Sequence, residues 1–237
     1  MNVLFPMAGQ GARFGHTFKP FLTIDDGTFI EAAVEPFRKH VAHITKFVFV
    51  YLEQQDRDFD VQRRLATMFA GLPYEVALLD RPTRGPAETI GRAVDQLKLT
   101  GPAFLCDCDH AVDVTPLFDI VARGERFDAL LPVWPLEGEN LASWSVARVE
   151  DGRVSAIAEK QMPAGDRGTP MGVIGCYGFA DLAATSARAL ALDATNFSDV
   201  LREMIAQDRV VRAATIENAR FFGDPDRLAQ AIARGTP

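Results

Sequence analysis

Residues 3–20 read VLFPMAGQGARFGHTFKP, an apolar run that leads through a glycine loop to a lysine and a proline. The apolar residues at its start suit a short strand that is buried on both faces. The glycines that follow allow the backbone to turn its N–H groups inward, as in loops that cradle an anion. Arg13 and Lys19 add positive charge at the same place. This stretch therefore predicts a binding site for a phosphate chain.

Two better-known phosphate-binding loops do not fit this stretch. The dinucleotide fingerprint needs glycine or alanine three residues after its second glycine, where this chain has Phe14. The P-loop needs a glycine followed by Lys and then Ser or Thr, whereas Lys19 precedes Pro20. A tight turn with solvated Arg13 and Lys19 is the alternative to a phosphate site. The combination of glycines, Arg and Lys directly after a strand favours the site.

The stretch PMAGQGARFGHTFKPFLTI, residues 6–24, resembles the signature of the sugar-phosphate nucleotidyltransferases, A-G-x-G-x-R followed by K-P-L. The resemblance is to the branch associated with capsule and lipopolysaccharide precursors. In this family the loop wraps the triphosphate of a nucleotide, and the Arg and Lys neutralise its charge during transfer. The resemblance implies catalytic roles for Arg13 and Lys19 and nucleotide binding by Ala8, Gly9, Gly11 and Arg13.

Composition narrows the class of protein. With 237 residues, 48% of them hydrophobic, the chain can form one domain over residues 1–237. A net charge of −7 argues against a nucleic-acid partner, which normally requires a basic surface. Cys106, Cys108 and Cys176 lack C-x-x-C spacing and suit packing positions in a reducing compartment. The start of the chain lacks a basic leader and the apolar run 47–52 is too short for a bilayer, so we expect a soluble, cytoplasmic protein without a membrane partner.

Strand and helix patterns alternate along the first part of the chain. Short apolar runs predict strands at 3–6, 46–52, 74–79, 103–106 and 129–134. Stretches with apolar residues at helical spacing or with capping signals predict helices at 28–39, 56–70, 86–97 and 115–123. This alternation predicts an α/β fold whose mixed sheet is mostly parallel, with helices on both faces.

The pattern changes after residue 134. Asp151-Gly152 is a two-residue hairpin signal between strands expected at 143–150 and 153–159. The remaining predicted elements are a strand at 172–179, helices at 182–192 and 197–207, and a strand at 210–216. The order agrees with the Rossmann-like, GT-A-like nucleotidyltransferase fold that the resemblance implies, with a small hairpin subregion.

The loop 80–89 follows the strand predicted at 74–79, and ligands of open α/β sheets collect at the carboxyl ends of strands. From the residues alone, a nucleotide-binding loop and a plain Pro/Gly turn before a helix are about equally supported. In the family, a G-x-A stretch at this place reads the base. The resemblance therefore implies nucleotide binding by backbone near Thr83 and Gly85.

Asp107 and Asp109 follow the strand predicted at 103–106. If the strand continues, these two carboxylates share one side, and Cys106 and Cys108 the other. Two carboxylates beside a triphosphate suit Mg²⁺, which favours one or two protein carboxylates together with phosphate oxygens and water. Solvated acids at a strand end are the alternative. The family's metal-binding Asp corresponds to Asp109, which leaves Asp107 as a helper.

The hairpin ends in Glu159-Lys160, where the family has an E-K pair that contacts the acceptor. The resemblance implies acceptor binding by Glu159, Lys160 and Gly172, with Gly175 as another glycine of close approach. An exposed Glu-Lys pair at a strand end is the alternative interpretation. Near the end of the chain, FGDPDRL resembles the family's G-T-P-E-D-L, and Asp224 competes with Asp107 as a second metal ligand.

The expected reaction couples a nucleoside triphosphate to a phosphorylated acceptor, with a sugar 1-phosphate as the first candidate, and releases pyrophosphate. Mg²⁺ is the expected cofactor, and a homo-oligomer is compatible with the sequence. Three alternatives remain open: a cytidylyltransferase acting on a non-sugar phosphate, a metal-dependent glycosyltransferase, and a catalytically inactive nucleotide-binding or regulatory module. The intact glycine loop favours the first expectation over a glycosyltransferase, which has no need to wrap a triphosphate.

Overall fold

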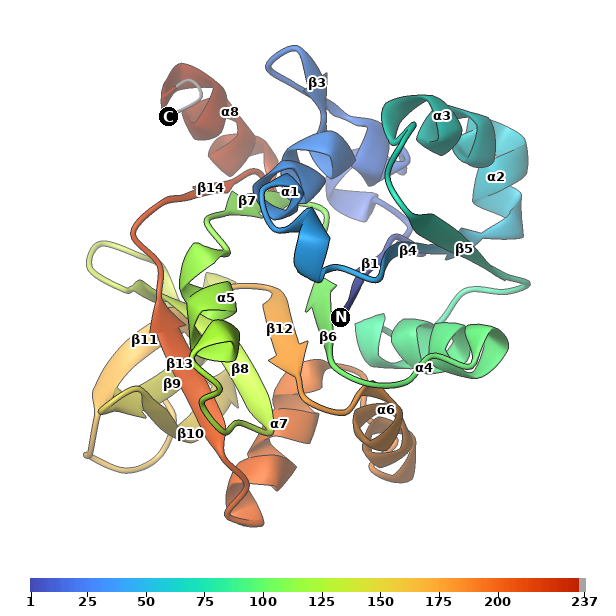
Figure 1. The fold of residues 1–237 in the computed structure, drawn as a ribbon. Coiled ribbons are helices and arrows are strands. Elements are labelled where there is room, and N and C mark those ends of the chain that lie inside the picture. The colour runs from blue at the N-terminus through green and yellow to red at the C-terminus, as the bar shows by residue number, and fades with distance from the viewer. Residues whose placement is uncertain (235–237) are drawn as a thin grey trace.

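Within residues 1–234, the part of the chain that the computed structural model describes, a ten-stranded mixed sheet runs through the molecule (Figure 1). From one edge to the other its strands are β11 (Thr169–Val173), β9 (Ser145–Glu150), β10 (Arg153–Glu159), β13 (Val211–Thr215), β8 (Ala129–Pro135), β12 (Cys176–Phe179), β6 (Ala103–Cys106), β1 (Asn2–Pro6), β4 (Lys46–Leu52) and β5 (Tyr74–Leu79). Two small antiparallel sheets accompany it, formed by β2 (Thr23–Ile24) with β3 (Gly27–Thr28) and by β7 (His110–Val112) with β14 (Ala219–Phe221).

The sheet has a parallel part and a largely antiparallel part. Strands β6, β1, β4 and β5 are parallel neighbours, as expected from the alternation of strands and helices. On the other side of β6, only β8 and β13 pair in parallel, and β12 joins the two parts by antiparallel pairing with both β6 and β8. The predicted α/β fold with a mixed, Rossmann-like sheet is confirmed, and its parallel pairing is concentrated in the first half of the chain.

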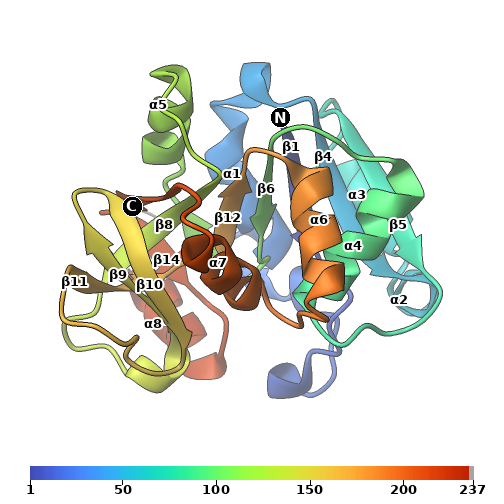
Figure 2. The same cartoon turned by 90° about the horizontal axis from the view of Figure 1, so that it is seen from below.

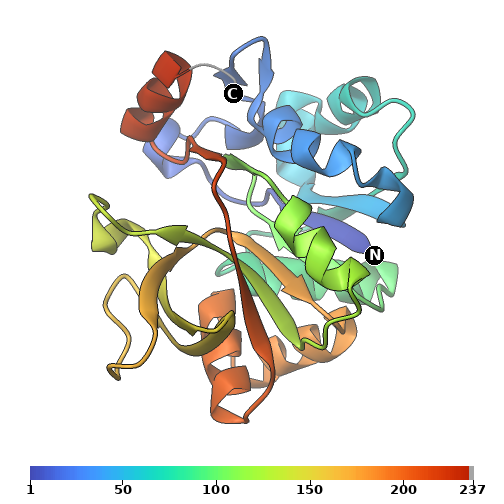
Figure 3. The same cartoon turned by 60° about the vertical axis from the view of Figure 1, so that its left-hand side comes forward.

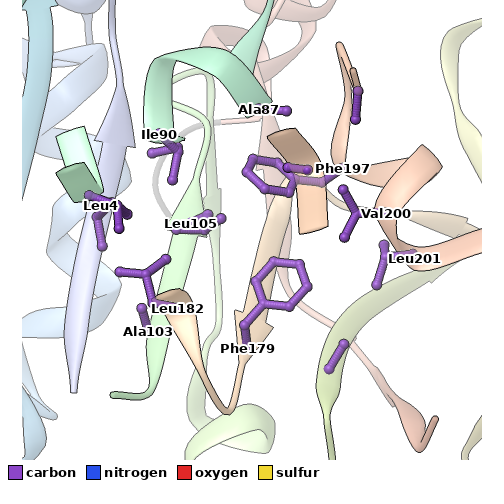
Figure 4. Packing of buried hydrophobic residues seen from close by; sticks show 14 of the residues in the cluster. Leu4, Ala87, Ile90, Ala103, Leu105, Phe179, Leu182, Phe197, Val200 and Leu201 are labelled. Carbon is purple, nitrogen blue, oxygen red and sulfur yellow. The ribbon is translucent and has the colours of Figure 1, made fainter. Parts of the chain in front are cut away.

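Helices cover both faces of the sheet, as Figures 1 and 2 show. One face carries α1 (Phe29–Arg38), α3 (Val61–Met68) and α5 (Thr115–Ala122), and the other carries α4 (Pro86–Leu97), α6 (Leu182–Ala191) and α7 (Phe197–Ala206). Alternation along β1 explains the division, because Val3 and Phe5 pack toward the first set and Leu4 toward the second. Figure 4 shows this second layer, in which Leu4, Leu105 and Phe179 meet Ile90 and Phe197.

Local signals explain where several elements begin and end. Thr28 caps α1 through a capping box, in which its hydroxyl accepts from the Glu31 N–H and the Glu31 carboxylate accepts from the Thr28 N–H. The helix expected at 56–70 is two helices, α2 (Glu53–Phe59) and α3, because Asp60 between them adopts a left-handed backbone with φ 52°.

The strand expected at 172–179 is also two strands. β11 ends at Val173 and pairs with β9 and β8, while β12 starts at Cys176 and pairs with β6. Residues 174–175 carry the chain from one set of partners to the other, so one apolar run serves two places in the sheet.

The C-terminal helix α8 (Pro225–Arg234) was missed by the sequence analysis. Figure 3 shows it beside the β2–β3 hairpin, although the two are far apart in the sequence. Ile24, Phe29 and Phe222 form a small buried cluster with Ala231 of α8, and Arg220 forms an ion pair with Asp25 at 2.6 Å. Across residues 1–234, none of the helices combines the length and apolar character needed to span a bilayer.

Candidate functional site

A cleft opens at the carboxyl ends of β1 and β6. It consists of three adjoining cavities of about 430, 320 and 240 Å³, all of which are lined by Pro6 at the end of β1 and Asp107 just after β6. We call them the hairpin cavity, the helix cavity and the lysine cavity, in order of decreasing volume. β1 and β6 are parallel neighbours, with Leu4 beside Leu105, so the loops that follow them meet at the same edge of the sheet.

The glycine loop lines all three cavities. Gly9 and Gly11 face the lysine cavity together with Lys19, Ala8 and Gly9 face the helix cavity, and Arg13 faces the hairpin cavity. Gly11 has φ 63°, and a Cβ there would overlap the carbonyl of Thr17, so this turn requires glycine. The Arg13 side chain is exposed and has no hydrogen-bond or ion-pair partner among residues 1–234.

Gln55, which the sequence alone did not single out, holds the glycine loop in place. Its side-chain amide donates to the carbonyl of Gly9 at 2.9 Å and accepts from the Leu52 N–H at 2.8 Å. Gln55 is buried, so both of its contacts are shielded from water. A glutamine in the first turn of a helix carries no distinctive sequence signal, because its role depends on a partner 46 residues away.

Thr83 and Gly85 lie in the helix cavity, opposite Ala8 and Gly9. The hydroxyls of Thr83 and Thr89 are 2.6 Å apart, and the Thr89 hydroxyl also donates to the carbonyl of Gly85 at 3.1 Å. A Cβ on Gly85 would lie 2.5 Å from the carbonyl oxygen of Thr195, so a side chain there would displace the loop before α7. These contacts hold the start of α4 at the rim of the cleft.

Asp107 lies on the floor where the three cavities meet. Its backbone N–H donates to the carbonyl of Gly175 at 2.7 Å, and a Cβ on Gly175 would overlap the Asp107 carboxylate. Among residues 1–234 the carboxylate has no hydrogen-bond or ion-pair partner. Burial, with a smaller contribution from the charge of Asp109, raises the pKa of Asp107 to about 6.

Asp109 is ion-paired with Lys19. Its other carboxylate oxygen lies 3.4 Å from Nδ1 of His110, which is buried. Burial opposes ionisation of Asp109, but the His110 hydrogen bond and the charge of Lys19 outweigh it and hold the pKa of Asp109 well below its usual value. The same pairing outweighs burial at Lys19 and raises the pKa of its ammonium. Lys19 and Asp109 are therefore both charged at neutral pH.

The strand β6 ends at Cys106, so Asp107 and Asp109 are not on a regular strand. The expected division of sides holds for Cys106, which is buried in the core, and for the two carboxylates, which line the lysine and hairpin cavities. Cys108 is also buried, but it lines the lysine cavity together with the carboxylates. Burial raises the pKa of Cys108 to about 12, which keeps this thiol protonated.

The two carboxylates fit a divalent cation of the oxygen-preferring kind. Within residues 1–234 no group of three or more His, Cys, Asp or Glu residues could hold a metal, so a cation here would need additional ligands. Mg²⁺ often binds in this manner, through one or two carboxylates together with phosphate oxygens and water. Asp107 offers a carboxylate without a hydrogen-bond or ion-pair partner in the described part of the chain, whereas the Asp224 carboxylate accepts from the Arg227 N–H at 2.9 Å at the start of α8.

Glu159 and Lys160 line the hairpin cavity at the end of β10. The Glu159 carboxylate accepts from the Ser145 hydroxyl at 2.5 Å, and the Lys160 N–H donates to the carbonyl of Trp144 at 2.9 Å. Lys160 has φ 55°, a left-handed conformation that costs energy for a residue with a Cβ. The hairpin thus presents a carboxylate and an ammonium toward the same cavity as Asp107 and Asp109.

Gly172, expected beside the acceptor, lies outside the lining of the three cavities. A Cβ there would lie 2.7 Å from the ring of Trp144, so Gly172 allows the indole to pack on β11. Gly175, three residues later, lines the hairpin cavity. The family resemblance implies that both glycines lie near the acceptor, and of the two the structure brings only Gly175 to the cleft.

The segment before α8 completes the cleft. The Phe222 N–H donates to the carbonyl of Asp109 at 2.9 Å, and the Gly223 carbonyl accepts from the Lys19 ammonium at 3.4 Å. Arg227 lines the hairpin cavity and lies 5.0 Å from the ring centroid of Trp144. Arg227 belongs to the helix that the sequence analysis missed.

The chain is similar to known proteins in sequence and in fold. Residues 4–151 match the family model described as "MobA-like NTP transferase domain". No curated protein sequence matches the chain significantly. The family match covers the glycine loop, the loop 80–89 and both Asp107 and Asp109.

Several solved structures share the fold. The nucleoside-diphosphate-sugar pyrophosphorylase from Vibrio cholerae RC9 is 23% identical, with a TM-score of 0.80 over 98% of this chain and 99% of that chain. The inositol-1-phosphate CTP transferase from T. maritima is 16% identical, with a TM-score of 0.75 over 100% of this chain and 97% of that chain. The UTP-bound UGPase from Acinetobacter baumannii is 15% identical, with a TM-score of 0.75 over 98% and 92% of the two chains.

Proposed function

The chain belongs to the family of MobA-like NTP transferase domains, and we propose that it joins a nucleoside triphosphate to a phosphorylated acceptor and releases pyrophosphate. A sugar 1-phosphate is the proposed acceptor. The observation that carries this proposal is one cleft lined by the glycine loop, by Asp107 and Asp109, and by the hairpin pair Glu159 and Lys160. These groups can bind two phosphorylated molecules end to end.

The nucleotide is proposed to occupy the side of the cleft that holds the lysine and helix cavities. Loop backbone at Ala8, Gly9 and Gly11 would surround its phosphates, and Thr83 and Gly85 would contact the base. Arg13 faces the adjoining hairpin cavity and has no partner among residues 1–234, so it would be available to bind a phosphate oxygen where the two substrates meet. Lys19 is held close by Asp109 and Gly223, so its ammonium already points into this part of the cleft.

The acceptor is proposed to occupy the hairpin cavity, with its phosphate on Lys160 and its hydroxyls on Glu159. An acceptor phosphate oxygen would attack the α-phosphorus of the nucleotide, and the bond from that phosphorus to the pyrophosphate would break. A phosphate monoester has its second pKa near ~6 and is largely dianionic at neutral pH, so this nucleophile needs no general base. The task of the protein is to position both substrates and to neutralise charge, and Arg13 and Lys19 would stabilise charge on the transferring and leaving phosphates.

Mg²⁺ is the proposed cofactor. It would be held by Asp109 and Asp107 and would neutralise charge on nucleotide oxygens when bound. Asp107 is preferred over Asp224 as the second ligand, because the Asp224 carboxylate already caps α8. The pairing with Lys19 keeps Asp109 ionised beside the phosphates, whereas burial raises the pKa of Asp107, whose charge a bound cation would favour.

Two alternatives differ in the support that specific observations give them. A cytidylyltransferase acting on a non-sugar phosphate is supported by the fold shared with the inositol-1-phosphate CTP transferase from T. maritima. An inactive nucleotide-binding module is opposed by the complete set of charged residues in the cleft. We also propose that the protein acts in capsule or cell-envelope precursor synthesis and is located in the cytoplasm.

The test is pyrophosphate release with Mg²⁺, with ATP, CTP, GTP, UTP and dTTP each paired with glucose 1-phosphate, other sugar 1-phosphates and inositol 1-phosphate. We expect release to require one nucleotide and one acceptor together, and EDTA to abolish it. Release with CTP and a non-sugar phosphate alone would select the first alternative. A nucleotide that raises the melting temperature without any release would select the binding module.

A further inference from the structure

Cys106 and Cys176 lie directly opposite each other on the antiparallel strands β6 and β12. Their Sγ atoms are 2.7 Å apart, and both side chains are buried. They come from places 70 residues apart in the chain, so the fold, and not local sequence, brings them together. No part of the proposed reaction uses either thiol.

The register of the strands favours a bond between them. The Asp107 N–H donates to the carbonyl of Gly175, which makes Asp107 and Gly175 a hydrogen-bonded pair in the ladder. Cys106 and Cys176, the next pair along, are therefore a non-hydrogen-bonded pair, in which the side chains of opposite residues approach most closely. The Cα atoms of such pairs lie about 4.5 Å apart, within the range of disulfides, about 4.4–6.8 Å.

The pair also lies one residue from the cleft on each strand. Cys106 precedes Asp107, and Cys176 follows Gly175. The Asp107 carboxylate and the Cα of Gly175 are in such close contact that a single added carbon would overlap. A small shift of β12 against β6 would therefore reach Asp107 without any intervening flexible segment.

We propose that Cys106 and Cys176 form an oxidation site, at which a peroxide joins them in a reversible disulfide that constrains the floor of the cleft and lowers turnover. One thiolate attacks a peroxide oxygen, the O–O bond breaks, and the sulfur becomes a sulfenic acid while water leaves. The second thiol attacks that sulfur and expels a second water. Two thiols lose two electrons and two protons to one hydrogen peroxide, which is reduced to two waters.

Burial sets the rate and the specificity of this reaction. Neither thiol lines the cleft, and both side chains lie in the core layer that contains α1 and α5. Oxidation therefore requires local opening of the strands and is slow compared with that of an exposed thiol. Once one thiol is oxidised, its partner is already in contact, so we expect the disulfide to form before any further oxidation.

The first test is mass spectrometry of the full chain after treatment with hydrogen peroxide and alkylation of the remaining thiols. Trypsin gives one peptide, 99–123, that contains both Cys106 and Cys108, and another, 168–188, that contains Cys176. We expect these two peptides to be linked, and to separate on treatment with dithiothreitol. Cys108→Ser should keep the link, because Cys108 has no thiol partner among residues 1–234, and Cys106→Ser should abolish it.

An unlinked pair of peptides after peroxide treatment would overturn the proposal, as would a link that survives in Cys106→Ser. Circular dichroism of each variant confirms that it is folded before oxidation. This test needs no substrate, so its result is independent of the proposed function.

The second test rests on the proposed function. We expect the linked protein to release pyrophosphate more slowly than the reduced protein, with recovery after dithiothreitol and no peroxide effect in Cys176→Ser. Equal turnover in the linked and reduced forms would overturn the coupling to the cleft. Absence of activity in the reduced wild-type protein would count against the proposed function instead.

Discussion

Lys19 and Asp109, 90 residues apart in the chain, form an ion pair at the meeting point of the glycine loop and the segment after β6. The pair joins a group proposed to act on phosphate to a group proposed to hold a metal. Each raises the charged fraction of the other, since the pKa of Asp109 is lowered and that of Lys19 is raised. Their contact also fixes the loop against the floor of the cleft before any substrate binds.

Substitution of Lys19 by alanine should lower turnover by at least ~10²-fold, as expected for the loss of one preorganised charge at the reacting phosphates. Lys39→Ala is the matched control, because Lys39 forms an exposed ion pair with Asp113 away from the cleft. Steady-state kinetics and the melting temperature of both variants check this expectation. A mild rate effect of Lys19→Ala in a folded protein would contradict the assignment.

Gln55→Ala should weaken nucleotide binding, although Gln55 itself is not proposed to contact the nucleotide. The substitution removes one hydrogen bond that holds Gly9, worth roughly 0.5–1.5 kcal/mol, so we expect the KM for the nucleotide to rise roughly 2- to 10-fold. It also leaves the buried Leu52 N–H without its partner, at a cost of about 1–3 kcal/mol in unfolding free energy. Gln54→Ala, at an exposed neighbouring position, is the control and should change neither quantity.

Gly175→Ala should move the Asp107 carboxylate, because the added Cβ overlaps it. The φ of Gly175 lies outside the left-handed region, so the loss would come from this overlap and not from backbone strain. A displacement near 1 Å can cost up to ~10²-fold in rate. Gly91→Ala in α4 is the control: its Cβ would lie 3.5 Å from the Ser186 hydroxyl, and alanine should stabilise the helix by about 0.5–1 kcal/mol.

Because Lys160 has a left-handed backbone, two substitutions can separate the role of its ammonium from the conformational cost of its Cβ. Lys160→Ala and Lys160→Gly both remove the ammonium, so each should raise the KM for the acceptor and leave the KM for the nucleotide unchanged. The glycine variant should be up to ~1 kcal/mol more stable than the alanine variant, since it removes the strain of a Cβ at φ 55°. Urea denaturation compares their stabilities, and equal acceptor KM values in wild type and both variants would exclude Lys160 from acceptor binding.

Glu88 should contribute to the pH dependence of stability. Hydrogen bonds from the backbone and side chain of Arg84, assisted by Arg92, lower the pKa of Glu88 to about 2 from its ordinary value of 4.5. A lowered folded-state pKa stabilises the protein above the unfolded-state pKa, and this contribution is lost as the pH falls from about 5 to about 2. Because Arg84 is exposed, the effect should stay below about 1 kcal/mol.

Glu88→Gln tests this contribution through unfolding free energies measured between pH 7 and pH 3. We expect the variant to be less stable than wild type at pH 7 and to approach it at pH 3. A constant difference across this range would show that the ion pairs of Glu88 add nothing beyond its packing.

Much of the fold could be predicted from the sequence because its signals are local. The apolar runs before the glycine loop and before Asp107 identify buried strands, and parallel strands bring the loops after them to one edge. Asp151-Gly152 specifies the hairpin through its turn alone. The Asp60 break was invisible, since a left-handed residue at the junction of α2 and α3 leaves the helical spacing nearly intact.

The parts of the site that escaped prediction depend on partners distant in the chain. Gln55 acts on Gly9 and Arg227 on Trp144, and the partner of the close approach expected at Gly175 is Asp107. Gly172 and Gly175 are equivalent in the sequence, and only the crossing of the chain between β11 and β12 decides which of them reaches the cleft. The residue types proposed to bind phosphate are recognisable in the sequence, whereas what holds them in place depends on the three-dimensional packing.

The contact of Phe222 and Gly223 with Asp109 and Lys19 has a consequence for how the protein is made. A ribosome synthesises the glycine loop first and this segment more than 200 residues later, so the two sides of this contact are made far apart in time. The cleft can be complete only after residues 219–223 have been made and β14 has paired with β7. The strands and carboxylates of the cleft are therefore synthesised before the segment that completes it.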